Sequence, residues 1–228
     1  MFGEMKQTLS RRKFITLSLA HLALLTSCDT SLSKETAPDV NIEVKIGQML
    51  LVGFRGTAVH PQSPIVQDIR NRQIGGVIFY DYDIAQKKEV RNIQSPRQVK
   101  TLIRRLQDYS KIPLLVGIDY EGGTVNRLPE KYGFPSTVSH QYLGDKNDLA
   151  FTQRQATKMA KTLANLGFNL NFAPVVDVNT NYRNPIIAKR ERSFSALPNI
   201  VAKHAIEFIK AHRRQNVLCT SIEANVFF

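Results

Sequence analysis

Two carboxylates, a glycine pair and an arginine stand together in residues 117–127, which read GIDYEGGTVNR. A carboxylate such as Asp119 accepts hydrogen bonds from hydroxyl groups, and the guanidinium of Arg127 offers several fixed donors to hydroxyl and carbonyl oxygens. Residues 113–118 before them form an apolar run that is too short for a helix and typical of a buried parallel strand. The pattern indicates polar groups at the carboxyl end of a strand, arranged to hold a sugar.

The second carboxylate of this segment, Glu121, has a different expected role. Glycoside hydrolysis often uses two carboxyl groups, but residues two apart after a strand can point in different directions. We therefore expect Glu121 to accept hydrogen bonds from the backbone or from an arginine and to hold the loop. Gly122 and Gly123 suit a sharp turn and do not match the three spaced glycines of a dinucleotide-binding loop.

The segment resembles the Asp-Gln-Glu-Gly-Gly-Arg-Val-Gln-Arg signature of glycoside hydrolase family 3, in particular its bacterial β-N-acetylglucosaminidase branch. Tyr120 stands in place of Gln, and Thr124 in place of Arg. A second resembling block lies at the distance expected for this family and comprises residues 171–179, 184–187 and 192–194. The similarity runs from about residue 46 to residue 219.

The resemblance implies a (β/α)8 TIM barrel that hydrolyses a terminal β-linked sugar by a retaining mechanism and needs no cofactor or metal. In the family, an aspartate attacks the anomeric carbon and a histidine serves as acid and base. The expected substrate is a glycan containing N-acetylhexosamine, with peptidoglycan-derived glycans among the candidates. The roles that carry over are those of substrate-binding residues: Asp119 grips the terminal sugar, and Arg127 and Arg192 contact it. For Asp119 the alternative is an aspartate that caps a helix or a turn. For Arg127 and Arg192 the alternative is a surface salt bridge, above all for Arg192, because Arg190 is so near.

The reacting groups of the family have no counterpart in these 228 residues. The family's Lys-His-Phe-Pro-Gly-His loop is missing after residues 216–220, and so is the later nucleophilic aspartate. We therefore assign no catalytic residue, and we expect a truncated barrel without turnover. The alternative is a non-catalytic envelope lipoprotein that binds glycan.

The chain is basic, with 31 Lys and Arg against 19 Asp and Glu and a formal net charge of +12. Such a balance attracts nucleic acid, anionic membranes and acidic polymers alike. The cations are scattered over predicted helices and are not interleaved with base-stacking aromatics, so the sequence favours a solvated basic surface and no nucleic-acid partner. A hydrophobic content of 43% suffices for an ordinary core.

Residues 1–27 have the plan of a signal peptide. A basic region that includes Arg11 and Arg12 precedes an apolar run over residues 14–25, which is shorter than the roughly 20 residues needed to span a bilayer. The basic region resembles a twin-arginine export signal, and residues 25–28 resemble a lipoprotein cleavage box that would place a lipid on Cys28. An ordinary secretory signal with an incidental cysteine is the alternative. We expect an exported lipoprotein, anchored to a membrane and facing the periplasm or the cell exterior.

Residues 28–41 are rich in polar residues and predict a flexible tether, and residues 42–228 predict the folded domain. Strands are expected over residues 50–54, 75–80, 113–118, 169–173 and 217–219. Helices are expected over residues 64–72, from 96, from 149 to a stop at Gly167, and from 198. This alternation predicts an α/β fold, an incomplete TIM barrel with about five of eight β/α units. The first and fifth strands would then be open edges, which favour aggregation.

The remaining candidates carry weaker signals. Asp81 and Asp83 could bind a cation through oxygen, but this spacing is more typical of a solvated loop, and we assign no metal site. The histidines at positions 140, 204 and 212 lack metal-ligand spacing and are expected on the surface or at the edge of the core. Cys219 lies in an apolar run and is expected to be a buried, inert thiol.

Overall fold

The computed structural model describes residues 41–223. The predicted signal peptide, the lipidation site at Cys28 and nearly all of the predicted tether lie outside these residues. Within the described part, no helix is long and apolar enough to cross a membrane.

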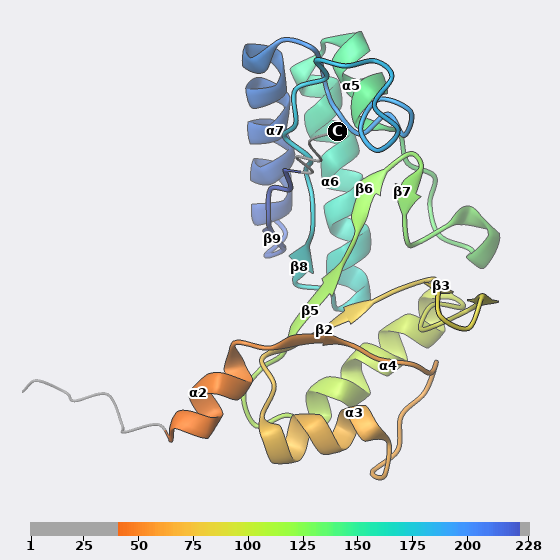
Figure 1. The fold of residues 1–228 in the computed structure, drawn as a ribbon, viewed down its shortest axis with the longest axis vertical. Helices are drawn as coiled ribbons and strands as arrows, with labels where there is room; N and C mark the ends of the chain where they lie inside the picture. The colour runs from red at the N-terminus through yellow and green to blue at the C-terminus, as the bar shows by residue number, and fades with distance from the viewer. Residues whose placement is uncertain (1–40, 224–228) are drawn as a thin grey trace, which may run out of the picture. The chain divides into compact units, whose positions relative to one another are not determined.

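A five-stranded parallel sheet organises the chain (Figure 1). Its strands are β1 (Leu51–Gly53), β2 (Gly76–Phe79), β5 (Leu115–Ile118), β8 (Leu170–Asn171) and β9 (Leu218–Cys219). Their order in the sheet is their order along the chain, and each neighbouring pair is parallel. This is the succession of a β/α barrel, in which each strand is joined to the next through a helix. Each of the five predicted strands is present, in shorter form.

Four helices connect these strands, as the sequence predicts. They are α3 (Pro64–Gln67), which continues as the π-helical segment η1 (Asp68–Arg72), α4 (Pro96–Asp108), α6 (Leu149–Leu166) and α7 (Pro198–Arg213). Ser95 caps α4 by accepting a hydrogen bond from the Gln98 N–H, and Gly167 ends α6 with φ of 101°. Helices α6 and α7 run side by side (Figure 1).

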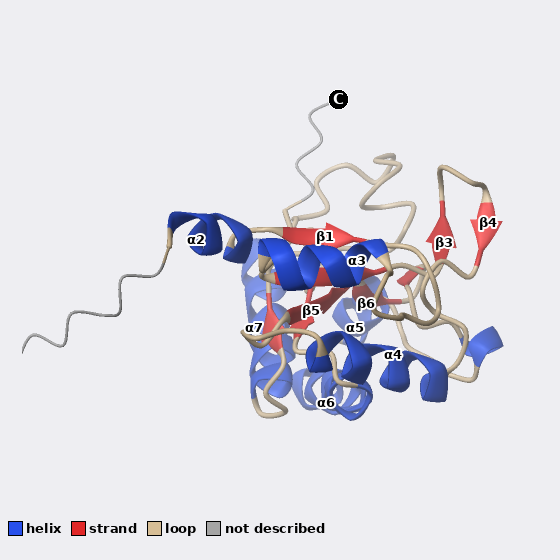
Figure 2. Ribbon diagram, turned by 90° about the horizontal axis from the view of Figure 1, so that it is seen from below, coloured by secondary structure: helices blue, strands red, loops and turns tan. Residues whose placement is uncertain are grey.

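Several short elements were not predicted. They are α2 (Ile42–Gln48), the antiparallel pairs β3 (Tyr82–Asp83) with β4 (Lys88–Glu89) and β6 (Tyr120–Gly122) with β7 (Val125–Asn126), η2 (Glu130–Tyr132) and α5 (His140–Lys146). The expected solvated loop at Asp81 and Asp83 is therefore wrong for Asp83, which lies buried in a hairpin that projects from the sheet (Figure 2). Its carboxylate pairs with Arg55, which follows β1.

The core lies between the sheet and the helices. Phe79 at the end of β2 is fully buried and packs edge-on against Phe54 and Phe168, with ring centroids 5.2 Å apart in both pairs.

Within the described residues, β1 and β9 are the outer strands of the sheet, as predicted. Leu218 on β9 is 59% exposed, an apolar side chain on an open edge.

Candidate functional site

Acidic residues gather where the parallel strands end. Asp81 follows β2 and Asp119 follows β5, so both stand at the carboxyl edge of neighbouring strands. Arg127, which follows β7, reaches both carboxylates: its Nη1 lies 3.4 Å from Asp81 Oδ1, and its Nε lies 3.5 Å from Asp119 Oδ2. Two carboxylates and a shared guanidinium thus meet at the edge where barrel enzymes place their sites.

The β6–β7 hairpin brings Asp119 and Arg127 together. The Arg127 N–H donates to the Asp119 carbonyl oxygen at 3.2 Å, so the hairpin closes with its two functional side chains adjacent. Gly122 and Gly123 turn the chain with φ of 96° and 60°, a left-handed backbone that disfavours a side chain. The sharp turn expected at this glycine pair is confirmed.

Asp119 remains accessible to a ligand although it is largely buried. Its side chain is 21% exposed, and that of Arg127 is 34% exposed. Burial raises the pKa of Asp119, whereas the nearby charge of Arg127 opposes this shift. At 3.5 Å the Arg127–Asp119 contact is long, so both groups have capacity to bond a ligand.

A buried asparagine fixes the backbone next to Asp119. Asn171 Oδ1 accepts from the Tyr120 N–H at 3.1 Å, and Asn171 Nδ2 donates to the Tyr120 carbonyl oxygen at 3.1 Å. The same Nδ2 lies 3.1 Å from His212 Nε2. Because His212 Nδ1 lies 3.0 Å from the Phe208 carbonyl oxygen, Nδ1 carries the hydrogen and Nε2 accepts. Helix α7 thereby sets the start of the functional loop.

Arg192 forms a bidentate ion pair with Glu121. Arg192 Nε and Nη2 lie 2.8 and 2.7 Å from the two carboxylate oxygens, the geometry of a charge-assisted pair. The Glu121 side chain is 3% exposed and that of Arg192 is 13% exposed. The hydrogen bonds that Arg192 donates to Glu121 raise the pKa of Arg192, while burial raises the pKa of Glu121 against the opposing effect of Arg192. Glu121 thus accepts hydrogen bonds from an arginine, as predicted.

The three predicted substrate-binding residues are thus placed in two neighbouring pairs. Asp119 and Arg127 are adjacent, and Arg192 is close enough for its charge to lower the pKa of Asp119. Arg192 is engaged by Glu121, in a buried pair rather than the surface salt bridge considered above. Sequence reasoning missed Asp81 as the second partner of Arg127. Its position directly after an apolar strand was the signal that could have found it.

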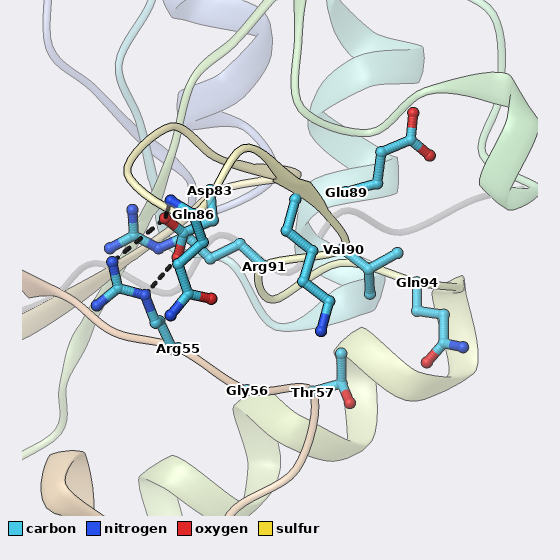
Figure 3. A pocket seen from close by; sticks show the side chains of 10 residues that line it. Arg55, Gly56, Thr57, Asp83, Gln86, Glu89, Val90, Arg91 and Gln94 are labelled. Carbon is cyan, nitrogen blue, oxygen red and sulfur yellow. Dashed lines mark hydrogen bonds and ion pairs between the residues drawn. The ribbon is translucent and has the colours of Figure 1, made fainter.

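A polar cleft of about 310 Å³ lies beside this site, between the segment after β1 and the β3–β4 hairpin (Figure 3). Arg55 and Asp83 bridge it, and Arg91 lines it. The Tyr80 ring lies near an arginine of each: the guanidinium carbon of Arg91, in the cleft, is 4.9 Å from its centroid, and that of Arg127, in the site, is 5.9 Å from it. Glu89 also lines the cleft, and its carboxylate pairs with Lys131.

The expected placement of three histidines on the surface or at the edge of the core is wrong. His140, His204 and His212 are fully buried, because they belong to a packed column of aromatic rings between α5, α6 and α7. Burial lowers the pKa of His140 and of His212 to about 4. Cys219 is partly buried, and burial raises the pKa of its thiol to about 12, as expected of an inert cysteine.

Comparison with known proteins identifies the family. Residues 41–222 match the glycosyl hydrolase family 3 N-terminal domain. Beta-hexosaminidase A of Pseudoalteromonas piscicida is 31% identical over 194 residues, which is 76% of this chain and 31% of that protein. A beta-hexosaminidase of Xylella fastidiosa (strain M23) is 32% identical over 168 residues, 71% of this chain and 45% of that protein. The chain thus spans less than half the length of these relatives.

Solved structures give the same result. A family 3 beta-N-acetylglucosaminidase from Paenibacillus sp. str. FPU-7 superposes with a TM-score of 0.71 at 29% identity, covering 80% of this chain and 33% of that one. A beta-N-acetylhexosaminidase from Beutenbergia cavernae gives a TM-score of 0.66 at 27% identity, covering 79% of this chain and 53% of that one. The predicted fold class and family resemblance are confirmed. The chain belongs to glycosyl hydrolase family 3, a family of glycosidases, and its described residues form part of the TIM-like N-terminal domain.

Proposed function

We propose that this chain provides the sugar-binding part of a family 3 glycosidase that acts on terminal β-linked N-acetylhexosamine. The observation that carries the proposal is the Asp119–Arg127 pair at the carboxyl edge of β2 and β5, with Asp81 as the further partner of the arginine. The beta-hexosaminidases among its relatives support this choice of sugar.

The chemistry of the pair suits a pyranose. The Asp119 carboxylate can accept hydrogen bonds from two neighbouring hydroxyl groups, and charge-assisted bonds of this kind are short and strong. Arg127 donates from several fixed positions to hydroxyl or carbonyl oxygens. Because Asp81 and Asp119 both hold the Arg127 guanidinium, its donors are oriented before a ligand arrives.

The Asp119 carboxylate provides the test of binding. Replacing Asp119 by alanine is expected to weaken the binding of N-acetylglucosamine by about ten- to a hundredfold, because a hydrogen bond to a charged group contributes about 1.5–3 kcal/mol. Titration calorimetry on purified wild-type and variant chains measures this. Asp108→Ala, which removes an exposed carboxylate at the end of α4, is the matched control and should bind like the wild type. Equal affinity of Asp119→Ala and the wild type would contradict the proposal.

We further propose that these 228 residues hold the sugar without cleaving it. The family's retaining reaction needs a nucleophilic aspartate and a histidine that moves protons, and no counterpart of that histidine loop occurs in the sequence given. His140, His204 and His212 are buried away from solvent and do not replace it. Incubation with nitrophenyl N-acetylglucosaminide should release no nitrophenol above the blank. Release that disappears in Asp119→Ala would show that the chain is catalytic.

A further inference from the structure

The segment that carries Arg192 contacts α5 (His140–Lys146) at several consecutive positions. The Gln141 N–H donates to the Glu191 carbonyl oxygen at 3.2 Å, and His140 Nδ1 lies 2.9 Å from the Arg192 carbonyl oxygen. Gly144 lies so close to the Phe194 backbone that an added Cβ would come within 1.6 Å of its carbonyl oxygen. The first turns of a short helix therefore determine where the Arg192 backbone lies.

This backbone is held in an uncommon conformation next to Arg192. Glu191 has φ of 54°, in the left-handed region that a residue other than glycine occupies at some cost. Such a conformation persists where the surrounding contacts over-determine it. The bonds from Gln141 and His140 to consecutive carbonyl oxygens are contacts of that kind.

His140 is the one residue of this attachment whose side chain bonds the Arg192 backbone. A carbonyl oxygen can only accept, so Nδ1 carries the hydrogen and the ring is a neutral donor. Among the described residues, no hydrogen-bond partner is found for the other nitrogen, Nε2, which is buried. Within residues 41–223, the His140 ring thus makes one hydrogen bond, to the backbone of Arg192, which is a predicted substrate-binding residue.

A column of stacked rings fixes the orientation of His140. Its ring lies 4.3 Å from that of Phe194 at 26° and 5.5 Å from that of Phe208 at 90°. His204 also stacks on Phe194, at 5.5 Å, and His212 stacks on Phe208 at 4.4 Å. One stacked and one edge-on ring contact allow the buried His140 ring little freedom, so its donor is held on the Arg192 carbonyl.

His204 shows what is particular to His140. Both rings are fully buried, and both stack on Phe194. Nδ1 of His204 instead lies 2.8 Å from the Thr152 hydroxyl on α6, away from the Arg192 backbone. A role in packing is common to the two residues, whereas the contact with the Arg192 segment belongs to His140.

We propose that His140 is a positioning residue of the sugar site: its Nδ1–H holds the Arg192 backbone so that the guanidinium stays paired with Glu121 beside Asp119. The proposal rests on the proposed function, since it gives Arg192 a part in binding sugar. Arg192 touches the ligand, and His140 acts through Arg192. Without the donor, the Arg192 carbonyl loses its buried partner and the segment shifts to find another.

Two phenylalanine variants test the proposal while keeping the ring column complete. His140→Phe removes the donor to Arg192, and His204→Phe removes the bond to Thr152. We expect His140→Phe to bind N-acetylglucosamine about tenfold more weakly than the wild type, the loss of about one hydrogen bond. His204→Phe is expected to bind within about twofold of the wild type. Urea unfolding of both variants shows whether they are folded at the binding temperature.

A third variant separates positioning from packing. His140→Asn places an amide N–H near the position of Nδ1 but has no ring, so it should unfold at lower urea than His140→Phe and yet bind sugar more tightly. The affinity for sugar would then depend on the hydrogen-bond donor at position 140, and the stability would depend on the aromatic ring there. Equal affinities of the two phenylalanine variants, or an asparagine variant as weak as His140→Phe at a urea concentration where it is folded, would overturn the proposal.

The wild type distinguishes this failure from that of the proposed function. If the wild type binds sugar through Asp119 but His140→Phe binds equally well, the positioning role is wrong and the proposed function stands. If the wild type binds no sugar at all, the proposed function fails and the positioning role fails with it.

Discussion

Lowering the pH from 7.5 to 5 is expected to reduce the free energy of unfolding by on the order of 4 kcal/mol, a large part of the stability of an ordinary domain. The cause is the burial of His140 and His212, whose pKa in the folded chain is about 4 against an ordinary value of about 6.5. Between pH 6.5 and pH 4, His140 and His212 are therefore protonated in the unfolded chain but remain neutral in the folded chain. The stability that depends on the neutral form of these two histidines is fully present above their ordinary pKa and is lost as the pH falls toward 4.

Other titrating groups modify this loss in known directions. Burial also lowers the pKa of His204, which adds to the loss. Asp119 and Glu121 have raised pKa values, so the folded chain takes up their protons more readily and recovers part of the stability. The Arg55 hydrogen bond lowers the pKa of Asp83 to about 2, which matters only at more acidic pH.

Urea unfolding at a series of pH values between 7.5 and 5 measures the effect. His140→Phe should remove about half of the slope of unfolding free energy against pH, because one of the two strongest contributors is gone. His60→Gln, which removes an exposed histidine outside the ring column, is the matched control. A wild-type unfolding free energy that is level from pH 7.5 to 5 would show that the buried histidines do not contribute as described.

Replacing Arg192 by methionine is expected to destabilise the chain by about 3–5 kcal/mol, because it leaves the Glu121 carboxylate buried without its partner. That carboxylate is 3% exposed and receives both of its hydrogen bonds from Arg192. The same substitution at Arg190, an exposed neighbour, should change stability by less than about 0.5 kcal/mol.

A double variant shows whether the unpaired charge is responsible. Glu121→Gln combined with Arg192→Met removes both charges and should recover a large part of the stability lost in Arg192→Met. Urea unfolding of Glu121→Gln, Arg192→Met and the double variant, compared with the wild type, gives the coupling free energy between the two residues. If the double variant is as unstable as the sum of the single variants, the two residues act independently and the ion pair has no structural role.

The sequence predicted those parts of the fold that local patterns determine. Apolar runs bounded by turn residues located each of the five parallel strands, and the Ser95 cap and Gly167 stop located the ends of two helices. The hairpin of β3 and β4 was missed because strands of two residues have no hydrophobic period of their own. An ion pair between the buried Asp83 and the half-exposed Arg55, from a distant segment, fixes it instead.

In the site, too, the sequence predicted what lies within one short segment and missed the contacts between distant segments. Asp119 and Arg127 lie in one short segment, so their closeness could be expected from the sequence. The pairing of Glu121 with Arg192 and the contact of His140 with the Arg192 carbonyl join segments that are distant in sequence. Only the packing of α5 and α7 brings those segments together, and no local pattern at His140 distinguishes a positioning role from an ordinary buried histidine.

The central claim is that the Asp119 carboxylate and the Arg127 guanidinium hold a sugar at the carboxyl edge of the sheet. A crystal structure of the wild-type chain soaked with N-acetylglucosamine tests it most directly. The account predicts sugar hydroxyl oxygens within hydrogen-bond distance of both Asp119 carboxylate oxygens, with Arg127 donating to the same ring. A sugar bound elsewhere, with Asp119 contacting protein groups alone, would contradict it.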